Sequence, residues 1–313
     1  ISPKSKLYEE HPDWCIHIDG RIRSEARKQL ILDLSRDEVC EAVIKMITDV
    51  LKSAPISYVK WDMNRNMTEI GSTAWPAKKQ KEIAHRYMLG LYKILENITS
   101  NFPNILFESC SGGGGRFDGG MLYYMPQTWT SDDTDAIERL MIQEGTSLVY
   151  PTSSMGSHVS AVPNHQVHRI TPLNTRGVVA MAGSFGYELD VTKMNEEEKE
   201  EVKKQVEFYK NIRSTVQFGD LYRLKSSFDS NEAAWMNLSK DGKEVVVSYV
   251  KKYAEANVIP RRLKVKALDE NSLYEVIETG EVFGGDELMY IGLEIGELMG
   301  DYQAKNWTLR KVD

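Results

Sequence analysis

The chain has 313 residues, of which 41% are hydrophobic and 27% are charged, a composition that is ordinary for a soluble globular protein with a large core. Its formal net charge is −7 and its pI is near 5.6. No basic surface is therefore expected to neutralise the phosphates of a nucleic acid or of an acidic membrane. A neutral substrate fits this charge better.

Three cysteines, Cys15, Cys40 and Cys110, are widely spaced, which indicates neither a disulfide framework nor a Cys-X-X-Cys metal site. A reducing, cytoplasmic location is expected. No apolar run approaches the roughly 18 residues that a membrane helix needs, and no signal-peptide pattern opens the chain. The chain begins at Ile1 without methionine, so the loss of an upstream segment, with any targeting signal, is also expected.

The first predicted helix covers residues 35–52, where Ser35 and Glu38 have the spacing of a capping box. A strand over 56–62 follows, because a β-branched and aromatic run ends there in Asp62. An amphipathic helix is predicted over 77–98, and a short strand over 105–108.

The next segments repeat this pattern of strand, loop and helix. Strands are predicted over 125–130, 148–150 and 178–182, and helices over 136–144 and 193–215. About five such units indicate a parallel α/β architecture. A closed barrel needs three more strands, so residues 1–218 are predicted to be the C-terminal part of a (β/α)8 TIM barrel.

From residue 219 the composition changes to alternating short strands separated by turn signals. These strands are predicted over 233–238, 244–249, 263–266, 273–278 and 307–311. The pattern predicts a second domain over 219–313, an antiparallel β-sandwich.

Asp62 lies at the C-terminal tip of its predicted strand, which is where barrel enzymes keep their chemistry. Lys60 is on the same face two residues earlier and would favour the ionised carboxylate that a nucleophile requires. The alternative is that Asp62 caps a turn and that Lys60 is a solvated edge residue. This stretch alone does not decide between them.

A glycine-rich loop over 111–120 follows the strand at 105–108. It has no Lys-Ser/Thr pair after its glycines and no acidic ribose partner, so it is neither a phosphate loop nor a dinucleotide site. We expect its backbone amides to approach a ligand closely. The alternative is a flexible connection.

A third motif packs Asp132, Asp133 and Asp135 between a predicted strand and helix. The acidic residues lack the alternation of an EF-hand. Asp135 precedes Glu138 by three residues and is expected to cap the helix. Asp132 is then left to face the site as a general acid, although the residues alone do not exclude Asp133.

Two carboxylates at two strand tips indicate glycoside hydrolysis, with Asp62 attacking and Asp132 protonating the leaving oxygen. Nearby aromatic residues would either stack on sugar rings or plug the core: Trp61, Trp129, Tyr123 and Tyr124. The pair His165 and His168 lacks an HExxH frame, so a structural role is favoured over metal binding.

Three segments resemble the bacterial α-galactosidases of glycoside hydrolase family 36. They are Lys-Trp-Asp-Met-Asn-Arg over 60–65, Cys-Ser-Gly-Gly-Gly-Gly-Arg-Phe-Asp over 110–118, and Trp-Thr-Ser-Asp with the residues that follow over 129–139. Residues 11–14, 21–27 and 155–158 extend the resemblance over essentially the whole chain.

The resemblance implies a (β/α)8 barrel followed by an antiparallel β domain, and a retaining double displacement with Asp62 as nucleophile and Asp132 as acid/base. Further positions match residues that contact the terminal galactose: Arg27, Lys60, Asn64, Cys110 and Gly112. No metal or organic cofactor is implied. Family members are commonly homotetramers that act on melibiose, raffinose and related α-galactosides.

The family's N-terminal β domain and first barrel strands have no counterpart here, so an inactive fragment with a structural or sugar-binding role is the alternative to an active enzyme. A further alternative is an α-N-acetylgalactosaminidase or a transglycosidase of the same family. The bulk of Cys110 disfavours an N-acetyl group at C2 of the sugar.

Overall fold

The computed structural model of the protein describes residues 1–257 and 259–312. The chain divides into two compact units, Ile1–Thr128 and Trp129–Asp313. They are named here the N-terminal unit and the C-terminal unit. Within the described residues, none of the helices has the length and apolar character that crossing a bilayer requires.

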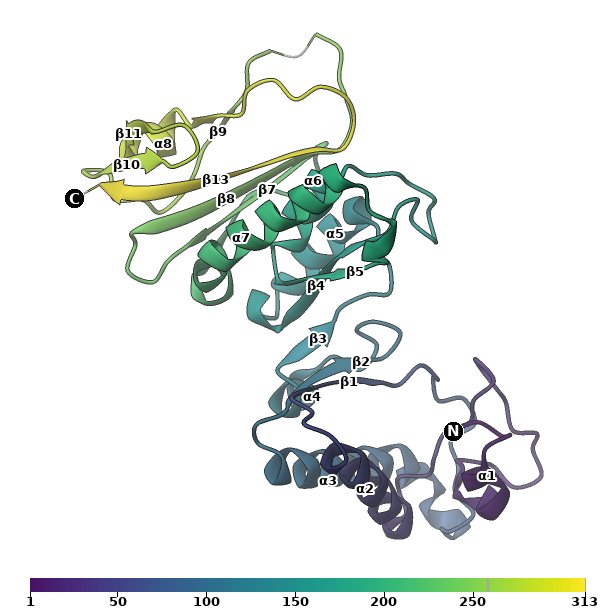
Figure 1. Cartoon of the computed structure of the whole chain (residues 1–313). Helices are drawn as coiled ribbons and strands as arrows, with labels where there is room; N and C mark the ends of the chain where they lie inside the picture. Colours follow the sequence, from purple (N-terminus) through teal and green to yellow (C-terminus); the bar gives the residue numbers. More distant parts are fainter. Residues whose placement is uncertain (258, 313) are drawn as a thin grey trace. The chain divides into compact units, whose positions relative to one another are not determined.

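The N-terminal unit is built around parallel strands in the order β1-β2-β3 (Figure 1). The strands are β1 (Tyr58–Asp62), β2 (Leu106–Cys110) and β3 (Gln127–Trp129). The helices are α1 (Lys6–Glu10), η1 (Pro12–Trp14), α2 (Asp37–Lys52), η2 (Ala77–Glu82), α3 (Ile83–Asn101) and α4 (Gly119–Tyr124). In the register, Lys60 pairs with Glu108, and Glu108 with Gln127. Three polar side chains therefore line up across neighbouring strands.

Helices α2 and α3 pack into one hydrophobic core with residues of β1 and β2. α3 buries Ile83, Tyr87, Leu91 and Leu95, because these side chains recur on one face of the helix. The strand that ends in Asp62 and the helix that follows it are therefore confirmed, although the first turns of that helix are the 3-10 helix η2.

The predicted capping box at Ser35 is wrong. The N-cap of α2 is Arg36, which makes no side-chain capping bond. The Ser35 hydroxyl instead donates to the Asp33 carboxylate and accepts from the Trp75 indole at 3.0 Å. Because the hydroxyl is engaged away from the helix, it does not reach the backbone amides of the first turn.

The first half of the C-terminal unit continues the parallel pattern with β4 and β5, which pair with each other. The elements are α5 (Ala136–Ser147), η3 (Thr152–Ser154), β4 (Met155–Ser160), α6 (Leu173–Ala180), β5 (Ser184–Glu188), η4 (Val191–Lys193) and α7 (Glu196–Phe218). The helices predicted over 136–144 and 193–215 are confirmed as α5 and α7.

Two strands predicted in this half are wrong. Residues 148–150 form an exposed turn after α5, in which Leu148 is 66% and Val149 is 77% exposed. Residues 178–180 end the helix α6, where Val178 and Val179 are buried. A short apolar run does not distinguish a strand from a piece of buried helix or from a turn.

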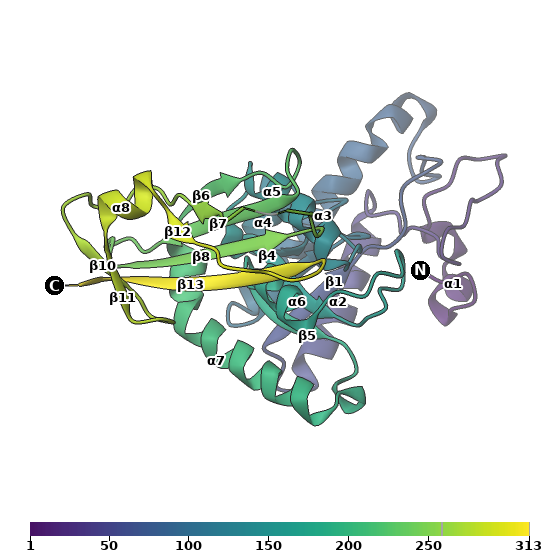
Figure 2. The same ribbon diagram turned by 90° about the horizontal axis from the view of Figure 1, so that it is seen from above.

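The second half of this unit contains an antiparallel sheet in the order β11-β10-β13-β8-β7-β6 (Figure 2). A two-stranded sheet of β12 and β9 packs into the same core as this sheet. The elements are β6 (Asp220–Lys225), β7 (Glu232–Leu238), β8 (Glu244–Lys251), β9 (Arg262–Leu263), β10 (Leu273–Val276), β11 (Glu281–Gly284), α8 (Gly285–Tyr290), β12 (Leu293–Glu294) and β13 (Gln303–Val312). All five predicted strands are present in part, whereas β6, β11 and β12 were not predicted.

Strand β8 is buried on both faces, and each face belongs to a different core. Val245, Val247 and Tyr249 pack into the core that includes the two-stranded sheet, whereas Val246 packs against helix α7. Successive side chains of a strand point to opposite faces, so helices cover one face and the second sheet covers the other. The predicted fold class, parallel β/α units of a TIM barrel followed by an antiparallel β domain, is confirmed.

Candidate active site

Asp62 is the last residue of β1, and its side chain is exposed at the tip of the strand. Asn64 donates from its side-chain amide to the Asp62 carboxylate at 3.3 Å. The backbone amide of Gly112 donates to the side-chain oxygen of Asn64, also at 3.3 Å. Three of the predicted site residues are thus joined in one chain of contacts.

The glycine-rich loop is tied to the end of β1 by further bonds. The amide of Met63 donates to the carbonyl of Cys110 at 2.9 Å, and the Ser111 hydroxyl donates to the carbonyl of Met63 at 2.8 Å. Gly112 and Gly113 have φ values of 55° and 87°, in the left-handed region that glycine adopts without strain. The backbone of this loop therefore contacts the loop that carries Asn64, and its predicted approach to a ligand stays a prediction.

Cys110 is a buried free thiol at the end of β2, opposite Asp62 in the strand register. Burial raises the pKa of this thiol to about 11, and a hydrogen bond to the Asp62 carboxylate acts in the same direction. The thiol is therefore neutral at physiological pH and acts as a donor beside the carboxylate.

A cavity of about 200 Å³ opens beside Asp62 in the N-terminal unit. Its polar lining includes Asp62, Asn64 and Arg116, and its apolar lining includes Trp61 and Leu91. A neutral polyhydroxylated ligand with apolar ring faces suits such a mixture of donors, acceptors and apolar surface.

Lys60 lies 3.6 Å from the carboxylate of Glu108, which is 1% exposed. Gln127 donates to the same carboxylate at 2.9 Å, and the Tyr58 hydroxyl also bonds to it. The structure therefore gives Lys60 a buried partner that the sequence did not indicate. The predicted effect of Lys60 on Asp62 stays a prediction.

Arg27 is placed differently from the other predicted residues. It is exposed in a tight turn between Ala26 and Gln29, with a φ of 53°. It is not among the residues that line the cavity beside Asp62. Its predicted contact with galactose stays a prediction.

Arg116 follows the glycines of this loop and was not predicted to be a site residue, yet it contacts both strands of the site. Its guanidinium donates to the carbonyl of Trp61 at 2.5 Å and to the hydroxyl of Ser109 at 3.2 Å. Burial lowers the pKa of Arg116, and the nearby groups of Tyr87, Cys110 and Asp62 oppose this.

In the C-terminal unit, the three carboxylates of the acidic loop over 131–135 differ in their contacts. Asp135 is the N-cap of α5, as predicted, and also pairs with Arg169. Asp133 accepts from the amide of Asp135 at 3.0 Å. In the described part of the chain, Asp132 has no hydrogen bond or ion pair with the protein. Asp133 uses only one of its two carboxylate oxygens in this bond, so the choice of Asp132 over Asp133 as the general acid stays a prediction.

An aromatic stack lies beside this loop. The rings of Trp129 and His158 stack with centroids 4.6 Å apart, and the Arg139 guanidinium lies 4.3 Å from the centre of the Trp129 ring. His158 contacts Glu188 through Nδ1 at 2.8 Å. Trp129 is buried, so the stack fixes its ring and favours the core alternative over an exposed sugar platform.

Arg139 is 2% exposed and donates to the carbonyls of Ser131 at 3.1 Å and Gly156 at 3.0 Å. Its Nε donates to Gln143 at 3.3 Å. Burial lowers the pKa of Arg139 to about 10, which still leaves the group cationic at neutral pH.

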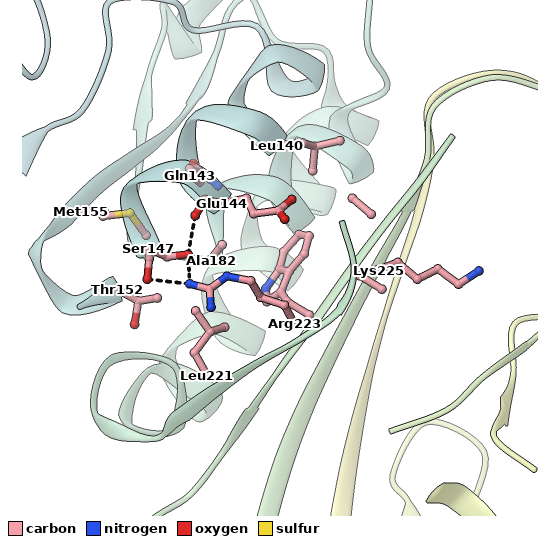
Figure 3. A pocket seen from close by; sticks show the side chains of 13 residues that line it. Leu140, Gln143, Glu144, Ser147, Thr152, Met155, Ala182, Leu221, Arg223 and Lys225 are labelled. Carbon is pink, nitrogen blue, oxygen red and sulfur yellow. Dashed lines mark hydrogen bonds between the residues drawn. The ribbon is translucent and has the colours of Figure 1, made fainter. Parts of the chain in front are cut away.

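A smaller cavity of about 40 Å³ lies between α5 and the antiparallel sheet (Figure 3). Its lining is mainly apolar, and Arg223 crosses it to donate to the carbonyl and hydroxyl of Ser147, at 2.5 and 2.7 Å. None of the predicted site residues lines this cavity. It is a packing gap between two layers.

Within residues 1–257 and 259–312, no group of three or more His, Cys, Asp or Glu side chains is arranged to hold a metal ion. His165 and His168 are both exposed, and His168 lies in a turn with a φ of 58°. The structural role favoured for this pair stays a prediction.

Residues 1–219 match the family model described as Melibiase, and residues 232–309 match the glycosyl hydrolase family 36 C-terminal domain. The chain is 61% identical over 312 residues to the α-galactosidase AgaA of Geobacillus stearothermophilus and 50% identical over 313 residues to the α-galactosidase Mel36A of Lactobacillus acidophilus. These alignments cover 100% of the chain but 43% of each relative.

Solved structures of AgaA superpose on the whole chain with a TM-score of 0.98 at 60% identity, and again cover 43% of that enzyme. One is a complex with raffinose and another is a complex with stachyose. Besides a substitution that both share, the first has an aspartate replaced by asparagine and the second has a different aspartate replaced by alanine.

Proposed function

This chain belongs to the Melibiase family, and on that premise we propose that it carries the two catalytic carboxylates of a retaining exo-α-galactosidase. The observation that carries the proposal is Asp62, exposed at the C-terminal tip of a parallel strand, with Asn64 and the glycine loop bonded around it. Because the chain spans 43% of the length of the relatives that it matches, its activity is part of the proposal.

In the first step, Asp62 attacks the anomeric carbon of the galactosyl group while the bond to the leaving oxygen breaks. Asp132 gives its proton to that oxygen, and a galactosyl-enzyme forms. Water then attacks the same carbon, Asp132 takes a proton from the water, and Asp62 is released. The exposure of Asp62 and the lack of protein partners for Asp132 in the described residues suit these roles.

The relatives support the choice of these two aspartates. In AgaA, the aspartates that were replaced in the raffinose and stachyose complexes are separated along the chain by the same number of positions as Asp62 and Asp132. Replacement of a catalytic carboxylate is a direct way to keep an intact oligosaccharide in an active site. We therefore propose raffinose and stachyose as the substrate class.

The first experiment compares hydrolysis of 4-nitrophenyl α-galactoside by this chain and by Asp62→Ala. We expect Asp62→Ala to remove turnover, and sodium azide to restore part of it as a glycosyl azide. A matched control is Asp49→Ala, because Asp49 is an exposed carboxylate on α2 whose ion pair, among the described residues, is with Lys45. Retention of activity in Asp62→Ala would contradict the proposal.

Asp132→Ala distinguishes the acid from the nucleophile. Its loss of activity should be much larger on raffinose than on 4-nitrophenyl α-galactoside, because a nitrophenolate leaves without protonation. Equal losses on both substrates would argue against acid catalysis by Asp132. Hydrolysis of the corresponding α-N-acetylgalactosaminide tests the alternative specificity in the same assay.

The non-catalytic alternative predicts a chain that binds sugar without hydrolysing it. In that case galactose raises the melting temperature, while no nitrophenol is released. The predicted homo-oligomer is tested by light scattering of the purified chain. A cytoplasmic location remains a prediction, with which the three free thiols agree.

A further inference from the structure

Resting on the proposed function, we infer that Arg116 and Arg139 are positioning residues that hold Asp62 and Asp132 through the main chain. Each arginine donates to the carbonyl oxygen of the residue directly before one of the two aspartates. Arg116 bonds to Trp61, and Arg139 bonds to Ser131. The two contacts lie in different units of the chain and repeat the same arrangement.

The planarity of the peptide bond explains how such a contact acts on an aspartate. The carbonyl oxygen of one residue and the Cα of the next lie in a single rigid plane. A donor that fixes the oxygen therefore restricts the rotation of that plane and the position of the next Cα. Asp62 and Asp132 are the residues whose Cα atoms are placed in this way.

Arg116 has a second anchor that makes its contact directional. Its Nε donates to the hydroxyl of Ser109, which is fully buried in β2 beside Cys110. The guanidinium thus links the end of β1 to the end of β2. Because the group is planar with donors in a fixed fork, one bond sets the direction of the other.

Arg139 is anchored on three sides. Besides Ser131, it donates to Gly156 in β4 and to Gln143 in α5, and its face stacks on Trp129. Gln143 is itself held, because it accepts from Ser157 at 2.6 Å and donates to Val179 at 3.0 Å. The loop that carries Asp132 is therefore attached to a rigid, buried framework.

A purely structural role would stabilise the fold without any preference for the aspartate-bearing segments. Hydrogen exchange measured by mass spectrometry separates the two roles and needs no activity. In Arg116→Gln we expect faster exchange in residues 61–64 and no change in 131–134. In Arg139→Gln we expect the reverse.

The matched control is Arg223→Gln. Arg223 also donates to a backbone carbonyl, that of Ser147 (Figure 3), but this carbonyl lies at the C-terminal end of α5, 15 positions after Asp132. Its variant should leave exchange in both segments unchanged. Unchanged exchange in the Arg116 and Arg139 variants, or a rise over the whole chain, would overturn the inference.

Kinetics then distinguish the two arginines by the step that each supports. Displacing a catalytic group by about 1 Å slows the reaction on the order of 100-fold. The rate of Arg116→Gln should therefore fall by about this factor on both 4-nitrophenyl α-galactoside and raffinose. The rate of Arg139→Gln should fall by this factor on raffinose and much less on the nitrophenyl substrate. The same loss on both substrates for both variants would overturn the assignment of separate roles.

An error in the proposed function can be distinguished from an error in the roles of the two arginines. If the unmodified chain and Asp62→Ala release nitrophenol equally slowly, the proposed activity of the chain is wrong. Hydrogen exchange still decides whether the arginines hold the two segments, because that measurement does not depend on turnover.

Discussion

The carboxylate of Asp135 accepts a hydrogen bond from the backbone amide of Glu138 at 3.0 Å. The same oxygen accepts from the amide of Ile137 and forms an ion pair with Arg169. Asp135 is 2% exposed, so one buried carboxylate both starts helix α5 and neutralises a cation. This arrangement leaves Asp132, three residues earlier, outside the structural network of its loop.

We expect Asp135→Ala to lower the free energy of unfolding by about 2 kcal/mol, because it removes a helix cap and the buried partner of Arg169, which then keeps only its pair with Glu138 at 3.3 Å. Urea denaturation measures the loss. Asp190→Ala is the control, since Asp190 is a half-exposed cap of the short helix η4 and should cost about 1 kcal/mol or less. Similar costs for the two variants would contradict this account.

Gly90→Ala and Gly145→Ala should change stability in opposite directions. A Cβ at Gly90 would lie 1.8 Å from the carbonyl oxygen of Leu34, whereas a Cβ at Gly145 would meet only the Phe228 ring at 3.7 Å. Gly90→Ala should therefore destabilise the fold by about 3 kcal/mol. Gly145→Ala should stabilise it by about 0.5 kcal/mol. Thermal unfolding of both variants tests the signs, and stabilisation by Gly90→Ala would contradict the close packing of α3 against Leu34.

The cysteines should resist alkylation in the folded chain. Burial raises the pKa of Cys40 and of Cys110 to about 11, and it also raises the pKa of Cys15. Since the thiolate is the reactive form, iodoacetamide at pH 8 should leave all three unlabelled, and urea should expose all three. Mass spectrometry counts the labels. Rapid labelling of Cys110 in the native chain would contradict its burial beside Asp62.

Glu232 should make the antiparallel domain sensitive to acid. Burial alone would raise its pKa, but hydrogen bonds from Lys225, Tyr249 and Arg261 outweigh this and lower the pKa below the usual 4.5. The resulting stabilisation is fully present above pH 4.5 and is lost as the pH falls through the lower folded-state pKa. Glu232→Gln should therefore be less stable than the unmodified chain at pH 7, and the difference should shrink in acid. A constant difference from pH 7 to pH 3 would contradict this.

Asp62, the glycine loop and the cap at Asp135 could be predicted because their signals are local. Each signal lies within about ten consecutive residues: a strand followed by a carboxylate, a run of glycines, and an aspartate three residues before a glutamate. The same locality explains the errors. The motif at Ser35 has the correct spacing, but its hydroxyl bonds to Asp33 and Trp75, and Trp75 is 40 positions away.

The supports of the site could not be predicted in this way. Arg116 donates to the carbonyl of Trp61, 55 positions earlier. Every residue has a backbone carbonyl, so such an acceptor cannot be recognised from the amino-acid sequence. Glu108 is a partial exception, because a charged residue at the end of an apolar strand is a visible signal. Its pairing with Lys60 depends on the register of β1 and β2, which only the structure gives.

The contacts of Arg116 and Arg139 also bear on how this chain can be altered. Both arginines bond to main-chain oxygens, and the carbonyl of residue 61 or 131 is the same whichever side chain that residue carries. Trp61 lines the cavity beside Asp62, so its side chain can be varied to reshape that wall while its carbonyl remains available to Arg116. Position 61 is thus a starting point for engineering a different sugar preference.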